Sequence, residues 1–265
     1  MPNETDFTAW IGRQEQTPAD LITPRMLAGY AATFAPHLAL SEPVPLGLHW
    51  CLSPPTVPAA ELGPDGHPLK GGFLPPVPLP RRMWAGSEIE LIAPLQLNDE
   101  VSRRSEILAV TQKSGRSGDL CFVTVAHEIY TARGLAIRER QTIVYRPAAT
   151  KAAPPVAPVT KRPVFDHSWQ ARIDEVMLLR YSGLTFNAHR IHYDYPYVTE
   201  IEHYSGLVIH GPLQATLMLN AATIAKGQQP RHFSFRGVSP ACGTQTLTVG
   251  MNLTDTGADL SVLSE

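Results

Sequence analysis

Residues 210–227 read HGPLQATLMLNAATIAKG, and this stretch predicts a helix that is buried on most of its sides. Pro212 suits the first turn of a helix, and Gly227 suits its C-terminal end. Nine of the fourteen positions between them are apolar and spread around the helix, so almost no polar face remains. A helix of this kind has to be surrounded by other elements, and that requirement decides the fold.

Strand-like runs supply the surroundings that this helix needs. Short runs follow it at 232–236, 246–253 and 260–263, and longer runs precede it at 88–92, 101–111, 120–130 and 135–145. Glycine-containing turns at 113–118 and 132–134 separate the longer runs, which indicates hairpins and an antiparallel sheet. A buried helix wrapped by an antiparallel sheet is the hot-dog arrangement, so we predict an α+β fold.

The chain is predicted to contain two related halves. A Pro- and Ala-rich linker at 148–163 separates residues 1–147 from residues 164–265. Each half opens with a short helix, and residues 27–34 faintly resemble residues 179–186. We therefore predict a double hot-dog with a degenerate N-terminal repeat and a catalytic C-terminal repeat.

Local signals place the two short helices and one long loop. Thr23 can cap a helix that starts at Pro24 and stops at Pro36, and Asp174 can cap the second short helix. The first half has a Pro-dense loop at 71–86 where the second half has its long apolar helix. Because proline lacks an N–H group, we expect this loop to stay out of the interior of any sheet.

Composition excludes several classes of function. Among 265 residues, 43% are hydrophobic and the formal net charge is −2, which favours neither nucleic acid nor an anionic membrane surface as a partner. No apolar run approaches the roughly 20 residues that span a bilayer. The polar N-terminus and the three widely spaced cysteines, which form no CxxC pair, favour a cytoplasmic protein with reduced thiols.

Residues 181–194, which read YSGLTFNAHRIHYD, concentrate the potential chemistry of the chain. They bring two imidazoles, an amide and a carboxylate into one short segment. A second histidine, His210, is followed by Gly211 at the start of the apolar helix. A proton-transfer group beside a helix N-terminus can add or remove water next to a carbonyl.

A metal site is the alternative interpretation of the same segment. His189, His192 and Asp194 are ligand types for zinc or iron. However, Arg190 places a permanent cation between two of these ligands, and the chain has no H-E-x-x-H pattern. We therefore expect no metal.

The chain resembles the MaoC-like hydratases and dehydratases, in particular the branch called hydroxyacyl-thioester dehydratase type 2, which includes mesaconyl-CoA and itaconyl-CoA hydratases. The resemblance rests on residues 73–86, 144–146, 184–194 and 210–214, which together are specific. It implies a hydro-lyase that acts on a CoA thioester as a small-molecule substrate. It also implies no cofactor and a homodimer or higher homo-oligomer.

The resemblance assigns roles within the histidine-rich segment. His192 falls on the catalytic histidine of the family, Asn187 on its catalytic aspartate, His189 on its asparagine and Arg190 on its proline. An amide orients water but takes no proton from it at neutral pH. We therefore expect His192 to transfer the proton and Asn187 to position the water, with His189 as a further candidate for acid/base chemistry.

The resemblance also implies how the thioester is held. The backbone N–H of Gly211 would polarise the carbonyl at the start of the buried helix, where N–H groups are unpaired. Substrate contacts are expected from six side chains, three of which have an alternative: a solvated rim charge for Arg82, and simple packing for Trp84 and Tyr181. The six are His189, Arg190, Tyr181, Arg82, Trp84 and His210.

The chemistry leaves the exact substrate open. A short dicarboxylic enoyl-CoA, itaconyl-CoA or mesaconyl-CoA, would give citramalyl-CoA, and Arg190, Arg180 or Arg82 could supply the cation that its free carboxylate needs. The alternatives are a 3-hydroxyacyl-thioester dehydratase of fatty-acid synthesis, a hot-dog thioesterase with Asp194 as its carboxylate, and a non-catalytic acyl-thioester binding protein.

Overall fold

The computed structural model describes residues 6–39, 43–115, 118–149 and 163–264, and most of the predicted linker therefore lies outside the described residues. Contacts divide the chain into two compact units. Unit 1 comprises residues 1–22, 55–148 and 231–238, and unit 2 comprises residues 23–54, 149–230 and 239–265.

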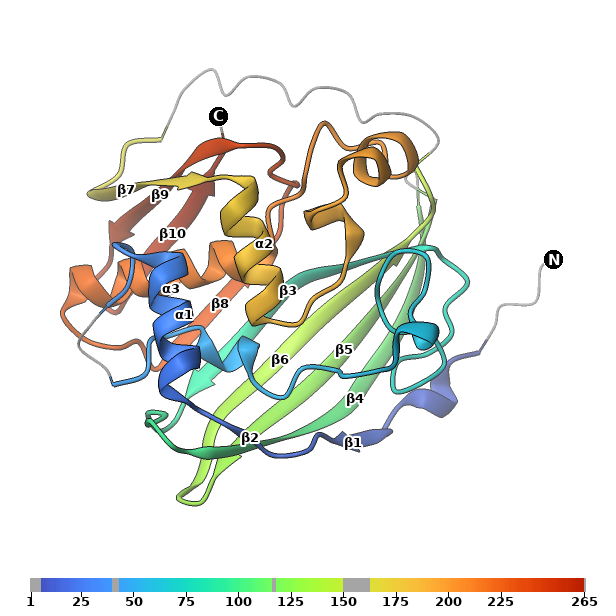
Figure 1. Ribbon diagram of the computed structural model, residues 1–265, viewed down its shortest axis with the longest axis horizontal. Coiled ribbons are helices and arrows are strands. Elements are labelled where there is room, and N and C mark those ends of the chain that lie inside the picture. Colours follow the sequence, from blue (N-terminus) through green and yellow to red (C-terminus); the bar gives the residue numbers. More distant parts are fainter. Residues whose placement is uncertain (1–5, 40–42, 116–117, 150–162, 265) are drawn as a thin grey trace. The chain divides into compact units, whose positions relative to one another are not determined.

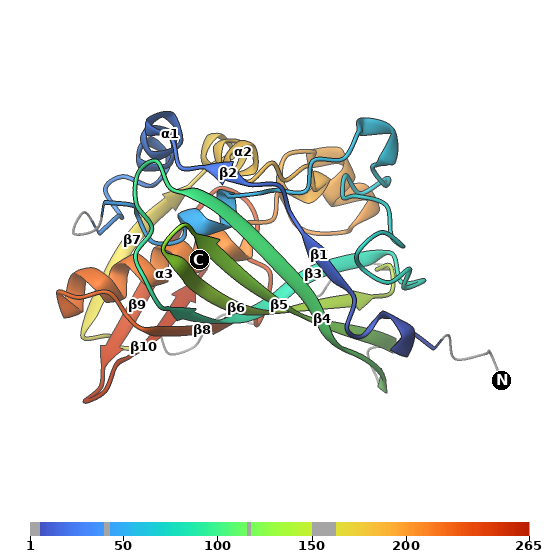
Figure 2. The ribbon, with the colours of Figure 1, turned by 90° about the horizontal axis from the view of Figure 1, so that it is seen from below.

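Unit 1 is built on one antiparallel sheet whose strands follow the order β1-β4-β5-β6-β3-β8, with β2 also pairing with β4 (Figures 1 and 2). Short 3-10 turns accompany it at Thr8–Trp10 and Ala59–Glu61. The tight turns at Gly118 and Gly134 have φ angles of 88° and 111°, which glycine adopts readily. The strands are β1 (Gln14–Gln16), β2 (Asp20–Leu21), β3 (Arg81–Leu91), β4 (Glu100–Gly115), β5 (Gly118–Thr131), β6 (Gly134–Arg146) and β8 (His232–Arg236).

The predicted strands of this sheet are confirmed, with one correction at the Pro-dense loop. β3 begins at Arg81, directly after Pro80, and pairs with both β6 and β8. The expectation that all of 71–86 stays out of the sheet interior is therefore wrong for residues 81–86. The prolines end at position 80, so nothing removes the backbone donors of the following residues.

Unit 2 combines three helices with a three-stranded antiparallel sheet in the order β10-β9-β7 (Figure 1). The long helix α3 contacts β9 and β10, and α1 contacts α2. The elements are α1 (Pro24–Phe34), α2 (Glu175–Leu184), α3 (Gly211–Lys226), β7 (His167–Ile173), β9 (Gln245–Leu253) and β10 (Ala258–Leu263), with a π-helical turn at Tyr197–Ile201 and 3-10 turns at Leu48–Cys51 and Arg190–His192.

The predicted helix boundaries in unit 2 are confirmed by their caps. The Thr23 hydroxyl accepts from the N–H of Met26 at 3.1 Å, and the Asp174 carboxylate accepts from the N–H of Met177 at 2.9 Å. Gly227 ends α3 in the left-handed conformation, with φ 66°. Strand β7 was not predicted, because it alternates weakly and has no hairpin turn beside it.

The long helix α3 is buried, as predicted, and its few polar side chains are hydrogen-bonded. Asn220 is completely buried. Its amide nitrogen donates to the carbonyls of Leu46 at 3.1 Å and Thr216 at 2.9 Å, and its oxygen accepts from the N–H of Ala39 at 3.0 Å. Asn220 therefore joins α3 to the segment that follows α1.

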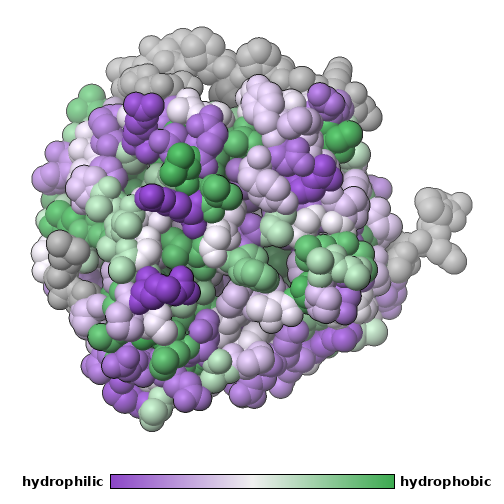
Figure 3. Space-filling view, viewed as in Figure 1, coloured by the Kyte–Doolittle hydropathy of each residue, from purple (hydrophilic) through white to green (hydrophobic). Residues whose placement is uncertain are grey.

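The contact-based units interleave along the chain, because β8 belongs to unit 1 and α1 belongs to unit 2. The predicted division into residues 1–147, a linker at 148–163 and residues 164–265 stays a prediction. None of the helices in the described ranges is long and apolar enough to cross a bilayer. On the face drawn in Figure 3, hydrophilic and hydrophobic residues are interspersed.

We predict that Asn220→Leu destabilises the protein by about 2–3 kcal/mol, because it leaves the buried N–H of Ala39 without an acceptor. Urea unfolding would measure the loss. The matched control is Asn252→Leu, since Asn252 accepts from the N–H of Asp166 at an exposed position and should cost less than about 1 kcal/mol. Equal losses in the two variants would contradict the assigned role of Asn220.

Candidate active site

Two histidine rings of unit 2 stack against each other beside the N-terminus of α3. The ring centroids of His192 and His210 are 3.6 Å apart, with an angle of 18° between the planes. His210 is the N-cap residue of α3, so the residue that follows it is Gly211. The structure therefore stacks the predicted base on the residue that directly precedes the predicted carbonyl-binding amide, within a single unit.

A backbone carbonyl fixes the tautomer of His192. The Nδ1 atom of His192 lies 2.7 Å from the oxygen of Val208. A carbonyl oxygen only accepts hydrogen bonds, so Nδ1 carries the proton in neutral His192. Nε2 then carries the lone pair, which is the requirement for a nitrogen that accepts a proton from water.

His210 is held from its other side by α2. Its Nε2 atom lies 2.9 Å from the hydroxyl oxygen of Ser182, and its ring centroid lies 5.0 Å from that of Tyr181. Within the described residues its Nδ1 atom is buried without a hydrogen-bond partner. Burial and the adjacent His192 hold the pKa of His210 well below 6.5, so this ring is neutral at physiological pH.

The start of α3 presents backbone donors at this place. The first intrahelical bond runs from the N–H of Gln214 to the carbonyl of His210, at 3.2 Å. The earlier N–H groups of the first turn, which include that of Gly211, have no acceptor within the helix. Gly211 is exposed, and the His210 side chain makes no capping bond in the described structure. An anionic oxygen is favoured here by both the free donors and the helix dipole.

The turn between α2 and His192 depends on Asn187. The side-chain oxygen of Asn187 accepts from the N–H of His189 at 3.0 Å, and its own N–H donates to the carbonyl of Ser182 at 2.9 Å. The preceding residue, Phe186, has a φ of 49°. The oxygen of Asn187 is therefore used in the turn, and its amide nitrogen is the group with donors for a water.

His189 lies beside this pair of rings. Its centroid is 5.5 Å from that of His192, and the two planes are nearly perpendicular at 87°. The His189 side chain is buried. The structure thus brings three of the predicted imidazoles together.

Two other predicted residues of unit 2 have structural partners. Arg190 donates to the carboxylate of Asp194 from Nε at 2.9 Å, and its guanidinium lies 4.1 Å from the ring centroid of Tyr197. The N–H of Tyr197 and the Arg190 side chain together lower the pKa of Asp194. Both oxygens of Asp194 are therefore occupied by partners in its own loop, Arg190 at one and the N–H of Tyr197 at the other, which weakens both the metal alternative and the thioesterase alternative. Tyr181 is completely buried and packs edge-on against Phe34 at 5.6 Å.

The remaining predicted residues, Arg82 and Trp84, belong to β3 in unit 1. The indole nitrogen of Trp84 donates to the carbonyl of Gly86 at 3.1 Å and to the hydroxyl of Ser87 at 2.9 Å. Trp84 thus takes part in the β-bulge between Trp84 and Gly86. Arg82 is half-buried and lies opposite Tyr145 of β6.

Comparison with known proteins identifies the family. The model of the family "Hydroxyacyl-thioester dehydratase type 2" matches residues 47–243. The chain belongs to this family. A curated relative, the mesaconyl-C(4)-CoA hydratase of Chloroflexus aurantiacus, is 44% identical over 242 residues, which are 90% of this chain and 86% of the relative.

Solved structures support the predicted α+β double hot-dog fold. A protein described as a MaoC-like dehydratase has a TM-score of 0.72 at 15% identity and covers 97% of this chain and 94% of its own. A conserved hypothetical protein of Mycobacterium tuberculosis, described as a double hot-dog, has a TM-score of 0.54 at 14% identity and covers 96% of this chain and 88% of its own. The chain accordingly has the double hot-dog fold.

We predict that the burial of His210 in this stack makes the protein less stable as the pH falls below 6.5. The folded pKa of His210 lies below 6.5, so the unfolded chain binds the additional proton, and the free energy of unfolding falls as pH drops below 6.5. The loss should be up to about 1.4 kcal/mol between pH 6.5 and 5.5. Urea unfolding at pH 7.5, 6.5 and 5.5 would measure it, and His210→Phe, which keeps a ring but does not titrate, should show a shallower slope. Identical slopes would contradict the assignment.

Proposed function

We propose that the protein is a hydro-lyase that reversibly hydrates an enoyl-CoA thioester. The observation that carries the proposal is the stacking of His192 on His210, the residue directly before Gly211. In this proposal, His192 as the base and the Gly211 amide as the anion-binding group act on the same acyl group. The 44% identity to a mesaconyl-C(4)-CoA hydratase supports the same chemistry.

His192 and Gly211 divide the reaction between them. Nε2 of His192 accepts a proton from water while the water oxygen bonds to the β-carbon of the enoyl group. The electron pair of the carbon–carbon double bond moves toward the thioester, and negative charge develops on its oxygen. The N–H of Gly211 donates to this oxygen, and a donor of this kind typically contributes about 3 kcal/mol to the barrier reduction. The enolate then reforms the thioester carbonyl as the α-carbon takes a proton from protonated His192, either directly or through His189, which returns the enzyme to its starting state and completes the addition of water.

Three further residues support His192 in this mechanism. The carbonyl of Val208 keeps the His192 proton on Nδ1, so the same nitrogen can always act as the base. The amide nitrogen of Asn187 orients the water. His189, whose ring lies 5.5 Å from that of His192, is the candidate to share the proton transfer. The proposed mechanism uses no metal and no organic cofactor.

The substrate that we propose is a short dicarboxylic enoyl-CoA, itaconyl-CoA or mesaconyl-CoA, with citramalyl-CoA as its hydration product. The name of the Chloroflexus relative supports this class. The second candidate is a 3-hydroxyacyl thioester that is dehydrated, and the name of the family supports that direction. We further propose that the enzyme works in the cytoplasm as a homodimer or higher homo-oligomer.

We predict that His192→Gln lowers kcat/KM for hydration by 10²–10⁴-fold without loss of fold, because removing a general base typically costs this much. The measurement is the loss of enoyl absorbance on addition of mesaconyl-CoA. The matched control is His167→Gln, at an exposed histidine of β7 in the same unit, which should retain wild-type activity. Full activity of His192→Gln would exclude the mechanism.

A thiol reagent in the same assay separates hydration from hydrolysis. A fall in enoyl absorbance without release of CoA supports a hydratase. Release of CoA would instead favour the thioesterase alternative, and binding of acyl-CoA with no turnover of any kind would favour a non-catalytic binding protein.

A further inference from the structure

A groove between α1 and α2 of unit 2 takes no part in the proposed mechanism. The two helices contact each other and lie side by side (Figure 1). The hollow between them has a volume of about 410 Å³, and every residue that lines it belongs to one of these two helices. This volume is in the range of small-molecule sites. We call the hollow the α1–α2 groove.

Two glycines keep the α1–α2 groove open. Gly29 lines it from α1 and Gly183 from α2. A Cβ atom at Gly183 would meet no neighbouring side chain or other backbone segment within 4 Å, and one at Gly29 would touch the side chain of Leu184 at 3.5 Å. Without side chains at these positions, a ligand can lie directly against the helix backbones. Met26 and Leu184 add apolar surface, which suits a flat apolar group such as a purine base.

Two arginines supply positive charge at opposite ends of the groove. Arg25 belongs to the first turn of α1, whereas Nη1 of Arg180 donates to the carbonyl of Ala32 in the last turn of that helix, at 3.2 Å. The residues between Arg25 and Ala32 span about 10 Å along the helix axis. The bond to Ala32 also restrains the Arg180 side chain, so less conformational entropy is lost when it binds a ligand.

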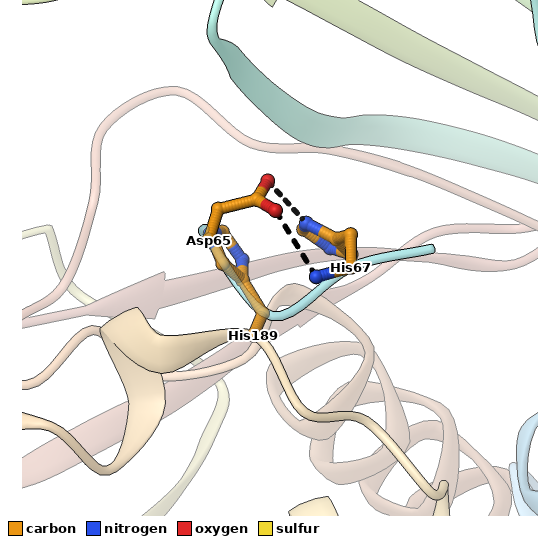
Figure 4. A group of neighbouring side chains, drawn as sticks. All are labelled: Asp65, His67 and His189. Atoms are coloured by element: carbon orange, nitrogen blue, oxygen red, sulfur yellow. Dashed lines mark hydrogen bonds and ion pairs between the residues drawn. The ribbon is translucent and has the colours of Figure 1, made fainter. Parts of the chain in front are cut away.

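Neither arginine has an anionic partner of its own. Among the residues that the structure describes, Arg25 and Arg180 form no ion pair, and no carboxylate lines the groove. Asp65 of unit 1 is an example of the opposite case. The backbone N–H and Nδ1 of His67 bond its two oxygens at 3.1 and 2.8 Å, so this anion is satisfied by its own loop (Figure 4). The α1–α2 groove therefore offers two cations to an anionic ligand.

The α1–α2 groove lies across α2 from the candidate active site. Arg180, Gly183 and Leu184 line the groove. Because a helix has about 3.6 residues per turn, Ser182 lies on the opposite face, where its hydroxyl is 2.9 Å from Nε2 of His210. A helix with its side chains is about 10–12 Å wide, so the groove and His210 are about that far apart within one unit.

An elongated ligand with several negative charges suits this groove best. Guanidinium groups bind phosphate oxygens through paired hydrogen bonds. A single carboxylate, such as the acyl carboxylate for which Arg180 is one candidate partner, would reach only one end of the groove. The nucleotide end of CoA carries a diphosphate and a 3′-phosphate on either side of a ribose, together with a purine base. It therefore combines separated anionic groups with a flat apolar part.

We propose that the α1–α2 groove binds the phosphorylated nucleotide end of a CoA thioester, with Arg25 and Arg180 on its phosphate groups. The pantetheine arm contains about a dozen consecutive bonds and extends to about 15 Å, which is enough to pass α2 and reach His192. This inference rests on the proposed function, because it names where the carrier part of the substrate binds. The groove makes the enzyme selective for CoA thioesters over thioesters whose carrier has no nucleotide.

Calorimetric titration with two thiols, CoA and 3′-dephospho-CoA, tests the site without any turnover. The wild-type protein should bind CoA at least about fivefold more tightly, since a charge-assisted hydrogen bond at a partly exposed site is worth a factor of this size. Arg25→Gln and Arg180→Gln should each weaken the binding of CoA by about five- to tenfold. Gly183→Leu, which fills the groove and changes no charge, should weaken it by a similar factor.

The matched control is Arg172→Gln. Arg172 is an exposed arginine of β7 in the same unit and does not line the groove. This variant loses the same charge and should bind CoA within about twofold of the wild type. Urea unfolding of each variant shows whether the fold is intact, and Arg25→Gln, at an exposed side chain, serves as the test if Gly183→Leu does not fold.

Kinetics show whether the bound nucleotide belongs to the substrate. With mesaconyl-CoA, Arg25→Gln and Arg180→Gln should lose about five- to tenfold in kcat/KM, and the loss should appear in KM because the nucleotide is bound equally in the ground state and the transition state. With mesaconyl-pantetheine, which has no phosphate groups, the loss should be less than about twofold. Adenosine 3′,5′-bisphosphate should compete with mesaconyl-CoA in the wild-type protein and compete less in the two variants.

The outcomes separate this proposal from the proposed function. Arginine variants that bind CoA as tightly as the wild type overturn the site. Adenosine 3′,5′-bisphosphate that binds without competing overturns the assignment to the substrate and indicates a separate nucleotide site. A wild-type preference for an acidic acyl-carrier protein over CoA, lost in the arginine variants, overturns it in favour of that protein. Each of these results leaves the hydratase intact if mesaconyl-CoA is still hydrated. A wild-type protein that neither binds nor hydrates any CoA thioester overturns the proposed function itself.

Discussion

The stacking of His192 on His210 is the interaction on which the candidate site depends. His210 has to be neutral to lie 3.6 Å from a second imidazole that accepts a proton, and its complete burial ensures this. Its contacts come from three separate parts of unit 2: Ser182 on α2, His192 on the following turn, and the start of α3. A shift in any one of these parts would move the base away from the amide of Gly211.

The buried polar residues of α3 explain why its first turn is fixed in position. Apolar packing specifies the register of a helix less sharply than hydrogen bonds do, because dispersion contacts are not directional. Thr216 and Asn220 remove that freedom: Tyr30 donates to Thr216 at 3.3 Å, and Asn220 bonds the backbone at Leu46 and Ala39. The register of α3, and with it the direction of its first N–H groups, is therefore set by hydrogen bonds about one to three turns further along the helix.

Local signals in the sequence were sufficient to predict most elements, whereas the candidate base came from the resemblance to a known family. Caps at Thr23 and Asp174, the glycine at 227 and the hairpin turns each act over a few residues, and the structure confirms the elements that they predicted. The pairing of β8 with β3 and the strand β7 depend on contacts between distant residues, which no short pattern records. The same reason explains why Ser182 and Val208 were missed: neither residue type signals that it will hold an imidazole.

The chain contains ten histidines, and their surroundings rather than their sequence neighbours assign their roles. His127 lies within the β4-β5-β6 part of the sheet, where Ser105 and Gln141 bond its two nitrogens and burial lowers its pKa to about 4. That ring is saturated by fixed partners and serves the fold. His192 differs because a carbonyl determines its tautomer, so that Nε2 carries the lone pair, and because its ring stacks on the N-cap residue of α3. An imidazole becomes a base when one nitrogen is fixed by a group that can only accept and the other lies where negative charge can be stabilised.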